Sequence, residues 1–525
     1  MSNKIAVLPM DARPCSSAFL DKIGCIGGFR VLLPPAEWYP DFIRGCDTQR
    51  MARWAIETAQ QVDCLIVSMD MLLFGGLAPA MWYQPAQSAP LERLAVLKEI
   101  RAQCPKLKLY AAFSVPGSSS AARSAKELVD RAQCMSYSQL SHKILLHGRD
   151  EDRQALDQLM EQIDTAALQD YLDVRDRAWQ VCMRLLDCLE DGTLDFLSLG
   201  ANDSSVYGLH RVRLQKLMEE IYRRDVEDRA VVYAGTDEQC QLLLIRAMQA
   251  LQNRQVRFFP RYSCSGGELL VAPFEYLPLG DNLRLMMFAA GCMMVDTPAQ
   301  ADVILMVNTA CQGWDDYREM EKAQSGYFLP EPRHNLWEFV SAIRWYDEQG
   351  CRIAVADAAF ANGCDIGLVR FLERCQDLTR LTAFSGWNTA ANTLGTAIAQ
   401  AAARTLYQLS GREELCCECR QQEFLLERFA DEYLYQVLVR PRVNALVEQK
   451  GGSVVNLEEL YEPINQYAAE QMAPLLKEFF ARHFQNRPLP GAFSGSRILS
   501  MQPRIRLPWA RTFEIAVDTP FTVGP

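Results

Sequence analysis

Short apolar runs alternate along this chain with longer segments in which apolar residues recur at helical spacing. Residues 91–102 and 211–224 show the helical pattern, with apolar positions three and four residues apart. Because strands that alternate with helices form parallel sheets with both faces covered, we predict an α/β fold with mainly parallel sheets. The predicted strands are 5–9, 29–33, 64–68, 108–113, 194–199, 230–234, 256–259, 303–307, 352–356 and 381–384.

Two long stretches break this alternation. Residues 118–191 are helical in pattern and strongly charged, which predicts a solvated helical insertion. Residues 413–484 are helical again, and the tail from Arg497 is β-like in pattern. The predicted regions are an α/β region over 1–250 that contains the insertion, a second α/β region over 251–410, and a helical segment with a β-rich tail over 411–525. The pattern leaves open whether the first region closes into a barrel.

The composition excludes some classes of partner. The formal net charge is −11 and the pI is about 5.2, so the chain lacks the basic footprint of a nucleic-acid-binding protein. No window approaches the length of a membrane span, and the short apolar run at the N-terminus leads directly into Asp11, unlike a signal peptide. We therefore expect a cytoplasmic protein without a nucleic-acid or membrane partner. A homo-oligomer stays open.

The cysteines and histidines predict no metal centre. The 18 cysteines are scattered and often lie inside apolar segments, as reduced thiols of a cytosolic protein do. Cys416, Cys417 and Cys419 form one cluster, which lacks a second Cys or His pair at zinc-binding spacing. The five histidines form no metal-binding motif. We expect neither a metal nor a cofactor.

Nearly every predicted strand is followed by a carboxylate or a carboxamide. One such residue alone is usually a helix cap or a turn residue. A convergent set at the carboxyl edge of a parallel sheet is the form that a polar active site takes. The polar residues that follow strands are Asp11, Arg13, Asp70, Asn202, Asp203, Tyr207, Asp237, Glu238, Asn308, Asp357, Asn362 and Asp365.

A polar helix start follows the last of these strands. Asn388 and Asn392 stand four residues apart, on one helix face, directly after Trp387. An aromatic plate beside carboxamides suits a neutral polyhydroxylated ligand such as a sugar. The alternative is a capped helix beside a core Trp, because Asn competes with the helical backbone and favours helix starts.

The acids at two strand ends have the form of catalytic groups. Neighbouring carboxylates can differ in pKa, so that one serves as acid and the other as base or nucleophile, as in glycoside hydrolysis. We predict Asp203 as the general acid, with Glu238 or Asp237 as base or nucleophile. The same acids would also suit Mg²⁺ or Ca²⁺, and Arg13 or Arg123 would suit an anionic group. The residues expected to bind substrate are Asp11, Arg13, Asp70, Asn202, Tyr207, Asn308, Asp357, Asn362, Asp365, Trp387, Asn388 and Asn392.

These motifs resemble a bacterial family, domain-of-unknown-function family 4127, over essentially the whole chain. The segments that carry the resemblance are 8–14, 67–77, 199–208, 233–238, 355–365, 386–395 and 507–514. The family pattern has an Asp-Asp pair where this chain has Asn202-Asp203. The replacement implies that Asn202 donates a hydrogen bond, or that catalysis is weakened or lost. An Asp-Asp pair is also similar to the active site of barrel-fold hexosaminidases, which suggests an N-acetylhexosaminide as a substrate.

Three functions follow as hypotheses. The first is a hydrolase that acts on a sugar or glycoside by carboxylate acid–base chemistry. The second is a divalent-metal hydrolase, such as a deacetylase or phosphoesterase. The third is a non-catalytic protein that binds a sugar or metabolite. Nucleotide-binding and serine-hydrolase classes are excluded by the lack of GxGxxG after a strand, of GxxxxGK[ST] and of GxSxG.

Overall fold

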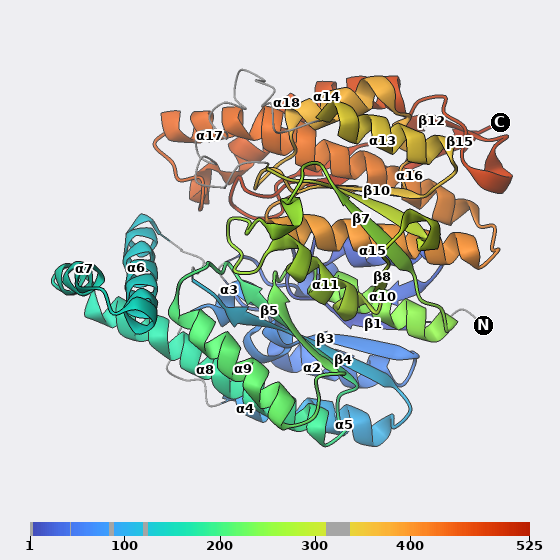
Figure 1. Ribbon diagram of the computed structural model, residues 1–525. Helices are drawn as coiled ribbons and strands as arrows, with labels where there is room; N and C mark the ends of the chain where they lie inside the picture. The colour runs from blue at the N-terminus through green and yellow to red at the C-terminus, as the bar shows by residue number, and fades with distance from the viewer. Residues whose placement is uncertain (1–3, 43, 83–88, 119–123, 311–335) are drawn as a thin grey trace. The chain divides into compact units, whose positions relative to one another are not determined.

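The computed structural model describes residues 4–42, 44–82, 89–118, 124–310 and 336–525, so Arg123 lies outside the described residues. Each predicted strand run contains a strand, and the predicted α/β class with parallel sheets is confirmed. The chain divides into two compact units (Figure 1). Unit 1 comprises residues 1–12, 31–243 and 274–277, and unit 2 comprises 13–30, 244–273 and 278–525.

Unit 1 is built on an open sheet in the order β2-β1-β3-β4-β5-β6. From β1 to β6 the described neighbours pair in parallel, and β2 and β6 are its edges, so the sheet does not close into a barrel. Its central strands are continuous apolar runs because helices cover both faces of such a sheet. The strands are β1 (Lys4–Leu8), β2 (Arg30–Leu32), β3 (Cys64–Ser68), β4 (Lys108–Pro116), β5 (Phe196–Asn202) and β6 (Ala230–Ala234).

The helices of unit 1 follow amphipathic patterns and local caps. Asp47, for example, starts α2 by accepting hydrogen bonds from the backbone N–H groups of Gln49 and Arg50. Helices α6, α7 and α8 come between β4 and β5 in the sequence (Figure 1). The helices are α2 (Thr48–Ala59), the π-helix η2 (Asp70–Phe74), α3 (Leu77–Ala80), α4 (Ala89–Glu92), α5 (Ala95–Gln103), α6 (Ala125–His147), α7 (Asp150–Met160), α8 (Thr165–Glu190) and α9 (Leu209–Arg223).

Unit 2 repeats the same strand order in its own sheet, β8-β7-β9-β10-β11. The first strand of each sheet lies between the second and the third, which gives both sheets a reversal in strand order. All described pairs in this second sheet are parallel. The strands are β7 (Arg257–Tyr262), β8 (Met293–Met294), β9 (Val303–Asn308), β10 (Ile353–Asp357) and β11 (Ala383–Ser385).

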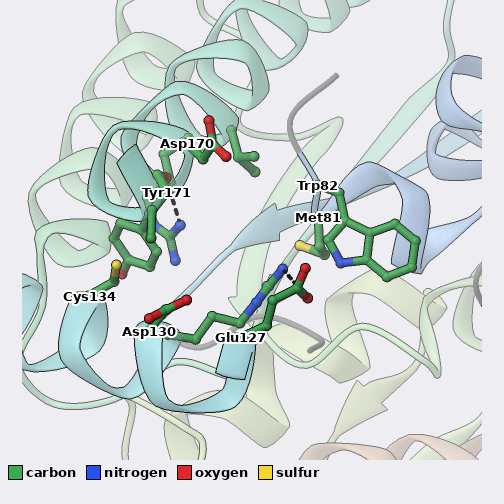
Figure 2. A pocket seen from close by; sticks show the side chains of 11 residues that line it. Met81, Trp82, Glu127, Asp130, Cys134, Asp170 and Tyr171 are labelled. Atoms are coloured by element: carbon green, nitrogen blue, oxygen red, sulfur yellow. Dashed lines mark hydrogen bonds and ion pairs between the residues drawn. The ribbon is translucent and has the colours of Figure 1, made fainter. Parts of the chain in front are cut away.

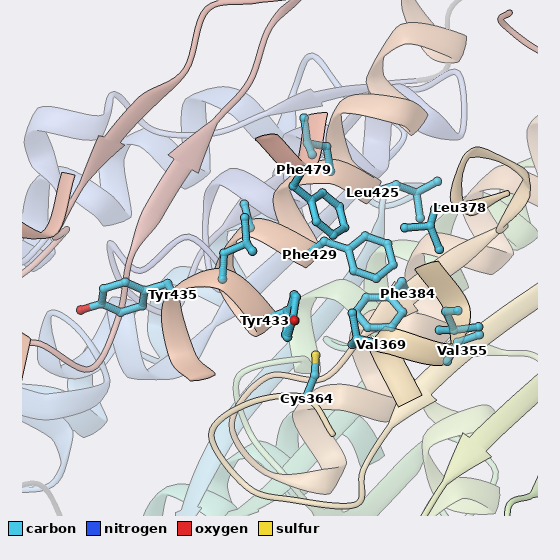
Figure 3. Packing of buried hydrophobic residues seen from close by; sticks show 14 of the residues in the cluster. Val355, Cys364, Val369, Leu378, Phe384, Leu425, Phe429, Tyr433, Tyr435 and Phe479 are labelled. Atoms are coloured by element: carbon cyan, nitrogen blue, oxygen red, sulfur yellow. The ribbon is translucent and has the colours of Figure 1, made fainter. Parts of the chain in front are cut away.

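A large apolar core stabilises unit 2 (Figure 3). Phe384 of β11 stacks on Phe429, with ring centroids 4.0 Å apart, and Phe429 also packs on Phe479. Antiparallel pairs β12–β15 and β13–β14 complete the C-terminal region. Its elements include α16 (Leu415–Phe429), the π-helix η7 (Ala430–Val439), α17 (Arg440–Gln449), α18 (Tyr461–His483), β12 (Arg497–Met501), β13 (Arg504–Arg506), β14 (Ala516–Asp518) and β15 (Phe521–Gly524).

The remaining helices lie mostly in unit 2. Helix α10 (Gln239–Gln252) crosses the boundary between the two units in sequence. The others in unit 2 are α1 (Ala18–Ile26), α11 (Leu279–Ala290), α13 (Leu336–Glu348), α14 (Ile366–Cys375) and α15 (Ala390–Leu409). Short 3₁₀ helices are Ala36–Trp38, Gly267–Leu269, Pro298–Gln300, Leu378–Arg380, Glu458–Leu460 and Gly491–Phe493. Among the helices described, none has the length and hydropathy needed to cross a membrane.

Candidate functional site

The candidate site of unit 1 lies at the carboxyl edge of its sheet, where the strand order reverses. Strand β1 lies between β2 and β3, so the strand that follows β1 and the strand that follows β3 are added at opposite sides of this pair. Doubly wound sheets bind ligands at this position. Asp11 follows β1 and Asp70 follows β3, which places one acid on each side of the reversal.

Asp70 is a deeply buried acid of this edge. It is only 1% exposed and begins the π-helix η2, a type of helical distortion that is frequent at functional sites. Ser114, on β4, donates to its Oδ2 from the backbone N–H at 3.1 Å and from the hydroxyl at 2.9 Å. Its Oδ1 is buried and has no hydrogen-bond partner among the described residues.

The environment of Asp70 favours its protonated form. The pKa of Asp70 is raised to about 7. Burial is the largest cause and the nearby charge of Asp11 adds to it, while the hydrogen bonds from Ser114 lower the pKa. Asp11 is itself 1% exposed. A carboxyl group with a pKa near neutrality is suited to general acid–base catalysis. The sequence predicted both residues as substrate ligands, and the perturbed pKa of Asp70 became visible only in the fold.

The loops after β4 and β5 approach each other closely. A Cβ on Gly117 would lie 2.0 Å from the carbonyl oxygen of Asn202 and 2.8 Å from that of Asp203, so only glycine fits at residue 117. The backbone N–H of Ser118 donates to the Asp203 carbonyl at 2.8 Å. Asp203 has a positive φ of 42° and is half-buried. This packing fixes the backbone that carries the predicted general acid.

Thr236 links the ends of β5 and β6. Its hydroxyl donates to Oδ1 of Asn202 at 3.2 Å, and its backbone N–H donates to Oε2 of Glu238 at 3.2 Å. Glu238 is fully buried, and Asp237 is 7% exposed. The structure thus connects Asn202 to Glu238 through a residue that the sequence did not single out. Ser114 and Thr236 share one signal, a hydroxyl side chain within two residues of a strand end.

Tyr207 belongs to the same loop region but faces the helical insertion. Its ring lies 6.1 Å from the rings of His142 and His147, and the Lys143 ammonium lies 5.2 Å from its centroid. Its contacts with α6 therefore give the half-buried Tyr207 a packing role.

In unit 2, three predicted residues meet at the ends of β9 and β10. The Asn308 amide donates to Oδ1 of Asp357 at 2.8 Å and to Oδ2 of Asp365 at 3.3 Å. The backbone N–H of Asp365 donates to Oδ2 of Asp357 at 2.7 Å. Burial and the charge of Asp365 raise the pKa of Asp357 to about 7. Asp365 also caps α14, so many of the hydrogen-bonding groups of this cluster already have partners in their own loop.

The helix start after β11 is a cap. Thr389 and Asn392 form a capping box at the start of α15, and the Asn388 amide donates to Oδ1 of Asn392 at 2.6 Å. Asn388 adopts a φ of 63°, and its carbonyl accepts from the backbone N–H of Asn362 at 2.9 Å. Trp387 is 5% exposed and packs near Phe513, with centroids 6.0 Å apart. These contacts match the capping alternative for this segment.

A buried charge cluster in unit 2 was missed by the sequence pattern. Glu432 accepts from the backbone N–H of Gly386 and, at 2.9 Å, from the guanidinium of Arg428. Burial raises the pKa of Glu432 to about 8 and that of Asp431 to about 6. Both acids lie in the π-helix η7. They follow a helix, so a search confined to strand ends passes over them.

Arg13 is also buried in this unit, with its guanidinium 5.4 Å from the Trp509 ring centroid.

Two cavities lie away from these sheet edges. One, of about 100 Å³, lies between α6 and α8 and is lined by Trp82, Arg131, Tyr171 and Arg175, among others (Figure 2). Arg175 anchors the loop after β4 by donating to the Gly117 carbonyl at 2.6 Å. The other, of about 560 Å³, lies at the amino ends of β10 and β11.

The predicted residues therefore divide between the two units. Asp11, Asp70, Asn202, Asp203, Tyr207, Asp237 and Glu238 belong to unit 1. Arg13, Asn308, Asp357, Asn362, Asp365, Trp387, Asn388 and Asn392 belong to unit 2.

The fold and the sheet edges define a class: a parallel α/β protein with two sheets of like strand order and buried carboxyl groups at strand ends. The chain belongs to the family described as Protein of unknown function (DUF4127), whose model matches residues 5–518. No curated protein matches the chain.

Two solved structures show weak similarity. A multifunctional pyruvate carboxylase from Rhizobium etli is 11% identical with a TM-score of 0.17, over 91% of this chain and 36% of the carboxylase chain. An A1-type ketoreductase is 14% identical with a TM-score of 0.14, over 77% of this chain and 87% of that chain. Neither similarity bears on the function of this chain.

Proposed function

We propose that this protein is a hydrolase that uses carboxylate acid–base chemistry at the carboxyl edge of the unit 1 sheet. The observation that carries the proposal is Asp70, whose buried Oδ1 has no hydrogen-bond partner among the described residues. Leaving a polar atom buried without a partner costs free energy, and a substrate hydroxyl or leaving-group oxygen would supply that partner. A pKa of about 7 allows the same carboxyl group to give or take a proton near neutral pH.

In this proposal Asp70 joins the predicted catalytic acids Asp203, Asp237 and Glu238. Asp70 takes the role of proton donor in place of Asp203, and Asp203, Asp237 or Glu238 is the base or nucleophile. A sugar or glycoside, with an N-acetylhexosaminide first, remains the proposed substrate class, because two carboxyl groups in different environments suit glycoside hydrolysis. A cytoplasmic location is also part of the proposal, and it is supported by the described cysteines, which form no disulfide with one another.

A divalent-metal hydrolase is the second candidate. It is favoured by the placement of Asp11 and Asp70 on the two sides of the strand reversal, since Mg²⁺ is often held by one or two carboxylates together with waters and substrate oxygens. Dependence of turnover on added Mg²⁺ or Mn²⁺, and its loss in EDTA, separates this candidate from the metal-independent one.

The test is a substrate screen followed by matched variants. Chromogenic glycosides, acetyl esters and phosphate esters are assayed with and without Mg²⁺. For the substrate that turns over, Asp70→Asn should lower kcat about 100-fold or more, the usual contribution of a general acid or base. Activity should fall as pH rises through about 7, because the proton donor is then ionised.

Asp157→Asn, an exposed acid on α7, is the control and should keep full activity. Undiminished turnover in Asp70→Asn would refute the role of Asp70. If no substrate turns over while a sugar raises the melting temperature, the protein is a binder and the hydrolase proposal fails.

A further inference from the structure

Three cysteine thiols from two distant parts of the chain meet in unit 2. Cys25 lies in the last turn of α1, and Cys416 and Cys417 lie in the first turn of α16. The three sulfur atoms all lie within 4.8 Å of one another. Among the described residues, this is the group of three or more His, Cys, Asp or Glu side chains that is close enough to hold a metal ion. The arrangement does not depend on the proposed hydrolase function.

We propose that Cys25, Cys416 and Cys417 bind a thiophilic divalent cation, with Zn²⁺ as the ion of this class. In a tetrahedral zinc site with Zn–S distances of about 2.3 Å, the sulfurs lie about 3.8 Å apart. The Sγ atoms of Cys416 and Cys417 are 4.0 Å apart, so they need to move only slightly. The Cys25 sulfur lies within 4.8 Å of both.

The Glu414 carboxylate lies beside two of the three thiols and is the fourth ligand of the proposed site. Oε2 of Glu414 lies 3.9 Å from the Cys416 sulfur and 3.8 Å from the Cys417 sulfur, a spacing suited to two ligands of one ion. Three thiolates and one carboxylate around Zn²⁺ carry a net charge of −2. The positive end of α16 and the neighbouring Arg420 offset part of that charge. Binding releases the thiol protons to solvent.

The exposure of the three cysteines suits a bound ion that exchanges with solvent. Cys416 is exposed, Cys25 is half-buried and Cys417 is buried, so an ion can reach the sulfurs from one side. The bound ion would join α1 to α16, which already pack together. The site would therefore add a cross-link between helices 391 residues apart in sequence.

The experiment is titration of the full-length protein, in a reducing buffer free of thiols and chelators, with Co²⁺ and then Zn²⁺. We expect one Co²⁺ per chain, thiolate-to-cobalt charge-transfer absorption, and displacement by Zn²⁺. Cys25→Ser, Cys416→Ser and Cys417→Ser should each weaken binding at least about 100-fold, since losing even an outer-shell partner of a metal ligand costs 10- to 100-fold. Zn²⁺ should raise the melting temperature of the wild type but not of Cys25→Ser.

The matched controls are two other cysteines. Cys419→Ser changes a residue two positions after Cys417 on α16, and Cys375→Ser changes an exposed cysteine on α14. Both should bind Co²⁺ as the wild type does. Because Cys416 is exposed, its serine variant keeps the fold, which circular dichroism would verify. Absence of thiolate-to-cobalt absorption in the wild type would overturn the proposal. Unchanged binding in Cys25→Ser, or loss of binding in Cys419→Ser, would overturn it as well.

Discussion

Ser114 donates two hydrogen bonds to one oxygen of Asp70, through its backbone N–H and its hydroxyl. The second carboxyl oxygen has no partner among the described residues. The two bonds fix the orientation of the Asp70 carboxyl group through one of its oxygens, while the other oxygen is buried. It is the relationship on which the proposed acid–base role depends.

The raised pKa of Asp70 predicts a pH-dependent stability. Its pKa is 3.8 in the unfolded reference and about 7 in the folded protein, so between these pH values the native state holds a proton that the unfolded state has lost. The contribution of Asp70 to the free energy of unfolding therefore falls as pH rises from about 4 to 7 and is constant above that range. Three pKa units correspond to about 4 kcal/mol.

Urea unfolding of the wild type and of Asp70→Asn between pH 4 and pH 8 measures this effect. The wild type should lose stability relative to the variant over that range, by up to about 4 kcal/mol. Asp157→Asn should show no such pH-dependent difference. Parallel stability curves for the wild type and Asp70→Asn would contradict the raised pKa.

Gly117→Ala should destabilise unit 1. Its new Cβ would lie 2.0 Å from the Asn202 carbonyl oxygen, and the backbone there would have to shift, at a cost of about 1–3 kcal/mol. Gly495→Ala is the matched control, because no atom lies within 4 Å of its added Cβ. Denaturant midpoints compare the two variants. Equal midpoints would show that the loops after β4 and β5 are further apart than described.

The capping box of α15 predicts a stability role for Asn392. Asn392→Ala and Thr389→Ala should each lower the free energy of unfolding by about 1 kcal/mol, the usual cost of losing a cap. Asn392→Asp keeps an acceptor oxygen and places a negative charge in the first helical turn, so it should retain stability. Thermal unfolding measures all three variants. If Asn392→Ala is as stable as the wild type, a ligand-binding role for Asn392 regains support.

A buried ion pair between α1 and α16 predicts a non-additive result. The Lys22 ammonium lies 2.7 Å from both carboxylate oxygens of Glu427 and 3.1 Å from Asp518. Lys22→Met leaves Glu427 buried without its main partner and should cost about 3–5 kcal/mol. The double variant Lys22→Met, Glu427→Leu should be less destabilised than Lys22→Met alone, because it no longer buries an unpaired carboxylate. Additive losses in a double-mutant cycle would refute the coupling.

Local pattern was enough to predict the strands and the parallel α/β class. Each run, such as 64–68 or 303–307, is apolar throughout because helices cover both faces of its sheet. The pattern also predicted that polar residues such as Asp70 and Asp357 follow the strands. It could not show that these two acids belong to different sheets, because strand pairing joins residues far apart in sequence.

The sequence by itself determined the elements, their order and the residue types at their ends, since these depend on spacing along the chain. Only the tertiary structure decided which ends meet. It buried Asp70 deeply enough to raise its pKa, assigned Asn392 to a helix cap, and brought Cys25 to Cys416 and Cys417. Burial and through-space distance set these properties, and neither is encoded in the spacing of any single segment.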